Sequence, residues 1–176
     1  MYNDQKVSLN SIRTLVFIDD TVEDFQSLIK ALSPSSQIIV IKSNSNELEQ
    51  MTQTLNKYTC LESLHLISNG SPGCLYFGKS YLSLFNIKYY AYQLKTWSVP
   101  NILLYGFNVA AGNIGKEFIK RLHLVTGANI GASIWGVDYT EKGVCLQLNY
   151  FLGEINHNLT ILPEPWQRKI TVFQNR

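Results

Sequence analysis

Residues 14–42, TLVFIDDTVEDFQSLIKALSPSSQIIVIK, hold two apolar runs separated by an amphipathic segment. The runs, at Thr14–Asp19 and 37–42, are typical of strands that are buried on both faces of a sheet. Between them, residues 22–32 repeat apolar side chains at helical spacing, and we expect Asp19 or Asp20 to cap this helix. The stretch therefore predicts a strand, a helix and a second, parallel strand.

The alternation of strand and helix continues along the chain. Apolar runs and helical periodicity predict further strands at 63–68, 101–106 and 128–134, and further helices at 44–58, 84–97 and 113–126. After a Gly-Ser-Pro-Gly turn we expect a hairpin over 75–82, and later candidate strands at 144–151 and 158–162. This order predicts an α/β fold of three layers, with a mostly parallel, doubly wound sheet, helices on both faces and an antiparallel edge pair.

The length and composition indicate one folded domain. The chain has 176 residues, of which 45% are hydrophobic and 16% are charged. Such a chain can bury one substantial core, which argues against disorder. We expect an N-terminal tail over 1–13, the domain over 14–162 and a C-terminal tail over 163–176.

The charge and the cysteines exclude several function classes. A formal net charge of +2 with scattered lysines and arginines is no footprint for nucleic acid. Three cysteines without a CxxC spacing indicate neither a disulfide framework nor a metal site, and favour a reducing, cytoplasmic location. No stretch approaches the roughly 18 apolar residues of a membrane span. Nucleotide-binding glycine motifs do not occur either, so we expect no cofactor.

The ends of the predicted parallel strands are where chemistry is expected. In open parallel sheets, ligands gather outside the carboxyl ends of the strands. The residues that arrive there, and that we take as candidate binding residues, are Asp19, Gly70, Ser71, Gly106 and Asn108. The third and fourth strands are expected to be neighbours, so that their two loops face one another.

Four stretches carry a resemblance to a known family. They are residues 15–32 (LVFIDDTVEDFQSLIKAL), 64–78 (LHLISNGSPGCLYFG), 102–119 (ILLYGFNVAAGNIGKEFI) and 125–133 (VTGANIGAS). Together they resemble a bacterial, mainly cyanobacterial, family of domains without assigned function. In that family the loop after the third strand typically reads Ser-His-Gly-Ser-Pro-Gly, and the loop after the fourth reads Tyr-Gly-Cys-Asn-Val-Ala. This arrangement is similar to that of caspases, gingipains and clostripain, and it implies a caspase-like fold with a His/Cys dyad.

Both dyad positions are substituted in this chain. Asn69 stands where the histidine is expected, and Phe107 stands where the cysteine is expected. An amide does not accept a proton near neutral pH, and a benzyl group has no nucleophilic atom. The resemblance therefore implies a catalytically inactive, caspase-like domain that serves as a protein-binding or scaffolding module in a larger assembly.

Two other functions stay open at this point. A displaced nucleophile, Cys74, could work with His65 in a cysteine peptidase, although a histidine inside a strand is more often a core residue. Alternatively, Gly70 and the backbone N–H of Phe107 could bind an anion or a small molecule at the strand ends.

The segment that begins near residue 82 carries a predicted partner surface. At helical spacing, Leu82, Phe85, Tyr89 and Tyr92 form a stripe opposite the apolar face assigned to the sheet. Either the hairpin or the C-terminal tail covers this stripe, or it is an exposed aromatic patch of the kind enriched at protein interfaces. The sequence names neither the protein partner nor the oligomeric state.

Overall fold

The computed structural model describes most of the chain, namely residues 11–43, 46–134, 139–140, 143–144, 148–156, 159 and 161. Residues 1–10 and 163–176, which make up most of the two predicted tails, lie outside the described residues, as does Cys145. Among the described residues, no helix is both long and apolar enough to cross a membrane.

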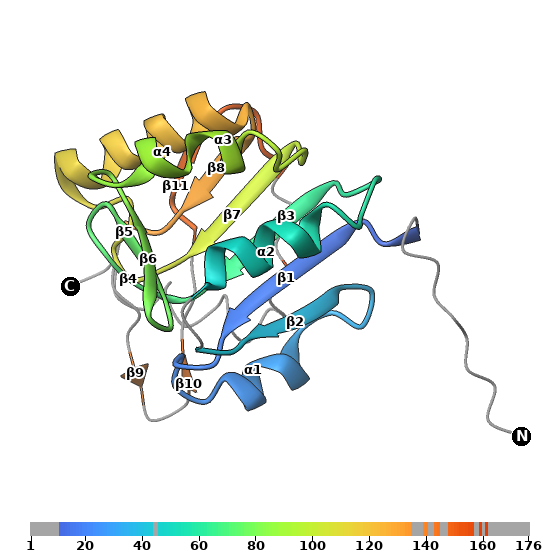
Figure 1. The fold of residues 1–176 in the computed structure, drawn as a ribbon. Helices are drawn as coiled ribbons and strands as arrows, with labels where there is room; N and C mark the ends of the chain where they lie inside the picture. Colours follow the sequence, from blue (N-terminus) through green and yellow to red (C-terminus); the bar gives the residue numbers. More distant parts are fainter. Residues whose placement is uncertain are drawn as a thin grey trace, which may run out of the picture.

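A six-stranded sheet forms the centre of the molecule and runs diagonally through Figure 1. Its spatial order is β11-β8-β7-β3-β1-β2, with β11 antiparallel to β8 and every other pair parallel. The strands are β1 (Thr14–Asp19), β2 (Gln37–Ile41), β3 (Ser63–Ile67), β7 (Asn101–Tyr105), β8 (Asn129–Ala132) and β11 (Tyr150–Leu152). The predicted mostly parallel α/β sheet with an antiparallel edge is confirmed.

Each face of the sheet contributes to a separate core, because successive side chains of a strand point to opposite faces. On one face the strands pack against α2 (Glu47–Leu55), α3 (Ala91–Leu94) and α4 (Gly112–Thr126). On the other face they pack against α1 (Phe25–Ala31), together with Leu148, Leu159 and Ile161. Helices on both faces are therefore confirmed, with the larger core under α2, α3 and α4.

Helix α1 is shorter than predicted and begins at Phe25 instead of residue 22. The Asp19 carboxylate accepts hydrogen bonds from the backbone N–H and the hydroxyl of Thr21, at 2.7 and 2.5 Å, which folds the chain into turns ahead of the helix. Asp24 occupies the N-cap position and makes no capping bond with its side chain. The prediction that Asp19 or Asp20 caps this helix is therefore wrong.

The predicted helix over 84–97 is also wrong in its extent. It is replaced by a 3₁₀ turn, η2 (Ile87–Tyr90), and by the single turn of α3. The Asn86 side chain accepts a hydrogen bond from the backbone N–H of Ser83 at 2.7 Å and donates one to the Tyr81 carbonyl at 2.9 Å. These bonds compete with helix formation and delay its start.

The C-terminal strands differ from the predicted 144–151 and 158–162. A short pair forms from β9 (Tyr139–Thr140) and β10 (Gly143–Val144), and β11 is a separate strand. Pairing with β8 starts at Asn149, whose N–H donates to the Ala132 carbonyl at 3.1 Å and whose side chain accepts a bond from Ile134 N–H at 2.7 Å. Of the second candidate, residues 159 and 161 are described, and neither is in a strand.

A small antiparallel sheet stands beside the carboxyl ends of the central strands (Figure 1). It consists of β4 (Asn69–Ser71), β5 (Cys74–Phe77) and β6 (Ser80–Ser83), so the predicted hairpin is confirmed and the preceding loop adds a third strand. This sheet meets the loop after β7, where Gly73 N–H donates to the Val109 carbonyl at 2.9 Å.

Candidate functional site

The loops after β3 and β7 lie against one another. A Cβ atom placed on Gly70 would lie 3.0 Å from both N and O of Phe107 and 3.2 Å from the Cys74 carbonyl oxygen. These distances are tighter than most Cβ contacts, so a glycine at position 70 favours the close approach of the two backbones. One placed on Gly106 would lie 3.9 Å from the Gly70 Cα atom. The structure thus brings together the two loops that carry Asn69 and Phe107.

The Asn69 side chain is tied to the loop after β1. Its amide donates to the Thr21 carbonyl at 3.2 Å and to the Thr21 hydroxyl at 3.1 Å. The same Thr21 hydroxyl donates to the buried carboxylate of Asp19. A chain of polar contacts from Asp19 through Thr21 therefore fixes the side chain at the position where the resemblance expects a histidine.

Phe107 follows Gly106 at the end of β7 and is half-buried. The next residue, Asn108, has a φ of 51°, a left-handed conformation that asparagine tolerates better than most residues. Its carbonyl accepts a bond from Ala111 N–H at 2.8 Å, immediately before α4 begins. Asn108 therefore acts in the turn that leads from the strand into α4.

Two buried carboxylates hold the hairpin turn between β5 and β6. Asp19 accepts a bond from Gly78 N–H at 2.5 Å, in addition to its two bonds from Thr21. Glu47, which is fully buried at the start of α2, accepts bonds from Lys79 N–H at 3.2 Å and from the Ser80 hydroxyl. All the described bonds of the Asp19 carboxylate are thus to donors of the protein itself. Glu47 was not predicted as a functional residue, because a glutamate at the start of a helix is typically exposed to solvent.

The alternative nucleophile has no base beside it in the described contacts. Cys74 is half-buried in β5, and burial raises the pKa of its thiol, with a smaller opposing effect from its contact with Tyr76. The neighbouring Ser71 hydroxyl is 3.0 Å from the Tyr76 hydroxyl. His65 lies inside β3 with both ring nitrogens occupied, at 3.0 Å from the Ser63 hydroxyl and 3.2 Å from the Tyr105 hydroxyl. The structure does not bring Cys74 and His65 together.

His65 is instead a core residue in a buried polar chain. Its ring stacks on Tyr105 with centroids 5.8 Å apart, and it is inaccessible to solvent. Burial lowers the pKa of His65 to about 3. Burial likewise raises the pKa of Tyr105, and a backbone hydrogen bond from Ile161 opposes that shift. The polar chain links β3 to β7 and to the described part of the C-terminal segment.

A shallow hollow of about 420 Å³ borders the loop that holds Asn69, and residues 20–26 line it. Its lining includes the carboxylates of Asp20, Glu23 and Asp24. Three acidic side chains disfavour an anion at this place. Among the described residues, no group of three or more His, Cys, Asp and Glu side chains could hold a metal ion.

The predicted partner surface needs one correction, since Leu82 is fully buried. Leu82 belongs to β6, where it pairs with buried Leu75, while the next pair, Tyr76 and Tyr81, points to solvent. Side chains on one face of a strand recur every second residue, so the helical spacing that assigned Leu82 to the stripe does not apply. The other three predicted residues remain on the surface: Phe85, Tyr89 and Tyr92 are 75%, 75% and 87% exposed. We call these three residues the aromatic patch.

Replacing the aromatic patch is expected to leave stability almost unchanged. The triple variant Phe85→Ser, Tyr89→Ser, Tyr92→Ser removes exposed side chains, so its free energy of unfolding in urea should stay within about 0.5 kcal/mol per site. Leu82→Ala is the contrasting control, because emptying a buried site costs about 2–5 kcal/mol. An equal loss of free energy of unfolding in a single patch variant and in Leu82→Ala would show that the patch is covered.

The chain matches a family of domains and is similar to a solved structure. A family model described as "Domain of unknown function (DUF4347)" matches residues 15–168. No curated protein matches the chain. A solved structure, the crystal structure of caspase-1 from Spodoptera frugiperda, is similar with a TM-score of 0.38 and 12% identity, over 74% of this chain and 64% of that one. The chain thus spans less than two thirds of the length of that structure.

Proposed function

This chain belongs to the DUF4347 family, and we propose that it is a catalytically inactive, caspase-like domain that acts as a protein-binding or scaffolding module within a larger assembly. The observation that carries this proposal is the contact between the Gly70 and Phe107 backbones. This contact supports the interpretation that the Asn69 amide and the Phe107 benzyl group stand at the positions where the family resemblance expects a base and a nucleophile.

Neither side chain can perform the missing chemistry. Asn69 uses its amide N–H groups to hold Thr21, and an amide does not titrate near neutral pH. Phe107 offers no atom that could attack a carbonyl. Loss of both groups leaves at most the weak acceleration that binding and backbone donors provide.

Two observations support a binding role over turnover. The loops at the strand ends remain closely packed around Gly70 and Gly106, so the scaffold of the site is kept without its reactive groups. The aromatic patch exposes three large side chains, and tyrosine and phenylalanine are enriched at protein interfaces. The free thiols of Cys60 and Cys74 fit a cytoplasmic location, which we also propose.

A peptidyl acyloxymethyl ketone, which alkylates active-site cysteines, should form no adduct with the purified chain, as measured by intact mass. Iodoacetamide under denaturing conditions is the control, because it should modify all three cysteines. Selective labelling of Cys74 together with peptide cleavage, both lost in Cys74→Ala, would establish the displaced-nucleophile peptidase in place of our proposal.

Restoring the two expected residues tests the geometry itself. In Asn69→His, Phe107→Cys, an imidazole near the new thiol should lower the thiol pKa, and the thiol should react with iodoacetamide at pH 7 about tenfold faster than in Phe107→Cys alone. Both variants must first show the native circular dichroism spectrum. Equal rates in two folded variants would mean that the side chains at 69 and 107 do not meet.

A further inference from the structure

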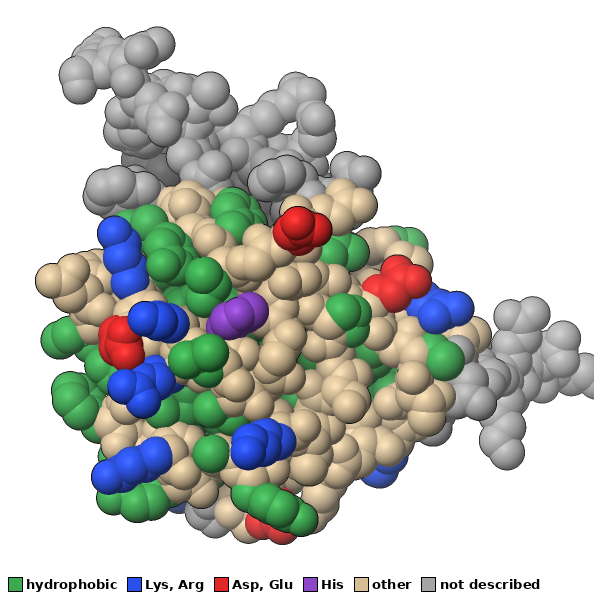
Figure 2. All heavy atoms as spheres, turned by 90° about the horizontal axis from the view of Figure 1, so that it is seen from above, with side chains coloured by type: hydrophobic (Ala, Val, Ile, Leu, Met, Phe, Trp, Pro, Cys, Tyr) green, Lys and Arg blue, Asp and Glu red, His purple; other side chains and the backbone are tan. Residues whose placement is uncertain are grey.

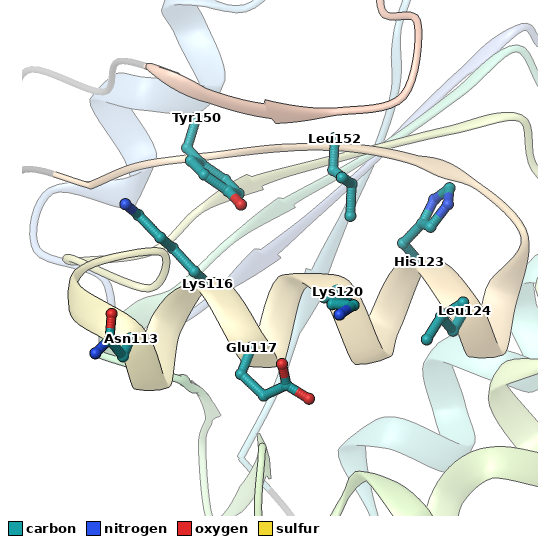
Figure 3. A pocket seen from close by; sticks show the side chains of 8 residues that line it. All are labelled: Asn113, Lys116, Glu117, Lys120, His123, Leu124, Tyr150 and Leu152. Carbon is teal, nitrogen blue, oxygen red and sulfur yellow. The ribbon is translucent and has the colours of Figure 1, made fainter.

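A groove of about 450 Å³ runs between α4 and the edge strand β11 (Figure 3). Eight side chains line it: Asn113, Lys116, Glu117, Lys120, His123, Leu124, Tyr150 and Leu152. None of them belongs to the aromatic patch or to the strand-end site, by which we mean the loops after β3 and β7 that carry Asn69 and Phe107. An inference from this groove therefore does not depend on whether the strand-end loops are catalytic.

The groove is positively charged. Lys116, Lys120 and His123 follow one another at spacings of four and three residues, which places them on one face of α4. The one acidic residue of the lining, Glu117, points away from β11 in Figure 3 and accepts a hydrogen bond from Arg121 at 2.8 Å. This bond lowers the pKa of Glu117, and the Arg121 guanidinium beside the carboxylate partly offsets its negative charge. Seen from above in Figure 2, lysine and arginine side chains gather next to a histidine on this face.

The other wall of the groove is apolar and aromatic. Tyr150 and Leu152 alternate along β11, so both point to the face that α4 covers, and both pack against the main core. The Lys116 ammonium lies 6.0 Å from the centre of the Tyr150 ring. Leu124, at the far end of the groove, is 67% exposed. The lysines of α4 thus lie beside a partly apolar surface formed by Tyr150, Leu152 and Leu124.

We propose that this groove binds an extended, acidic peptide segment of a partner protein, with carboxylates at alternate positions. From Asn113 to Leu124 the helix rises about 16 Å, which is the length of about five extended residues. Lys116 and Lys120 are separated by about 6 Å along the helix axis, close to the roughly 7 Å between alternate residues of a strand. Carboxylates on every second residue would meet both lysines, while the residues between them would rest on Tyr150 and Leu152.

The shape of the groove favours a peptide over a small molecule. Small-molecule sites enclose most of the ligand surface, whereas this groove is open along its length. A nucleic acid is disfavoured because the chain has a formal net charge of only +2 and only two lysines, Lys116 and Lys120, line the groove.

The probe is the peptide acetyl-Gly-Glu-Val-Glu-Val-Gly-amide, titrated into the ¹⁵N-labelled chain and followed by amide chemical shifts. We expect saturable shifts in α4 and β11, and an affinity about tenfold higher than for the peptide with Gln in place of Glu. Lys116→Glu, Lys120→Glu should weaken binding about tenfold or more. The matched control, Lys30→Glu, Lys57→Glu, makes the same charge change on exposed residues of other elements and should leave the affinity within about twofold.

Three outcomes would overturn the proposal. The first is no saturable shift with the Glu peptide at concentrations up to about 1 mM. The second is equal affinity for the Glu and Gln peptides, or equal loss in the control variant. The third is tighter binding of a five-nucleotide single-stranded DNA at the same amides, which would assign the groove to nucleic acid. A native circular dichroism spectrum of each variant separates lost binding from lost folding.

Discussion

Lowering the pH from 6.5 to about 4 is expected to cost the folded chain about 3 kcal/mol through His65 alone. The cause is the position of the imidazole in β3, where it is inaccessible to solvent and both ring nitrogens contact hydroxyl groups. Protonation there would place a charge in the core without a carboxylate beside it among the described contacts.

The sign of this effect follows from the number of protons bound by each state. The pKa of His65 falls from 6.5 in the unfolded chain to about 3 in the folded chain. Between these values the unfolded chain binds the extra proton, so stability decreases as the pH falls, by about 1.4 kcal/mol per pH unit. The contribution is fully present above pH 6.5 and is lost progressively toward about pH 3.

Urea denaturation at a series of pH values measures this contribution. His65→Gln keeps a polar side chain without a titrating group, so it should be less stable than the wild type at pH 7 but lose less stability on acidification. The free energy of unfolding is plotted against pH for both proteins. The difference between the two slopes isolates the contribution of His65, because the carboxylates titrate in both proteins. A folded-state NMR titration in which His65 protonates near pH 6 would contradict the expectation.

Asp19→Ala is expected to destabilise the chain by about 3 kcal/mol. Its carboxylate is 1% exposed and accepts bonds from the Thr21 N–H, the Thr21 hydroxyl and the Gly78 N–H. Truncation leaves these donors without their acceptor, and donors that stay buried bear the cost of desolvation. Because Thr21 also holds Asn69, the loop at the strand-end site should become more mobile.

The neighbouring Asp20 supplies a matched control. It is half-exposed, and its described side-chain contact is a 3.3 Å bond from the Ser43 hydroxyl. Asp20→Ala should therefore change the free energy of unfolding by less than about 1 kcal/mol. Amide hydrogen exchange at Gly78 and Asn69 provides the local readout. Equal stability losses for the two variants, or unchanged exchange at Gly78 in Asp19→Ala, would refute the role assigned to Asp19.

The elements that the sequence predicted best are the buried strands. The apolar runs at β1, β3 and β7 were predicted within one residue of their observed ends, because a strand covered on both faces must be apolar at nearly every position. Leu82 was misplaced because a helical period was assigned to a strand residue. The late start of α1 was missed because side-chain bonds of Asp19 compete with the helix.

Candidate sites divide in the same way. The approach of Gly70 to Phe107 was predictable, since neighbouring parallel strands end at the same edge. The groove beside α4 was not, although the spacing of Lys116, Lys120 and His123 is visible in the sequence. Its second wall, β11, follows α4 only after β8, β9 and β10, and the antiparallel register of Tyr150 with Ala132 places it there.

The sequence by itself determined the α/β class, the order of the strands along the chain and the residue types at the two loop tips. These properties depend on local periodicity and on the chemistry of single side chains. Both can be read from a short stretch of sequence without knowing which distant segments pack against it. Only the tertiary structure decided that Asp19 bonds within the protein, that His65 lies in a buried polar chain and that a cationic helix face meets an aromatic strand. Each of these depends on side chains from distant segments, whose approach is set by the packing of the whole sheet and its helices.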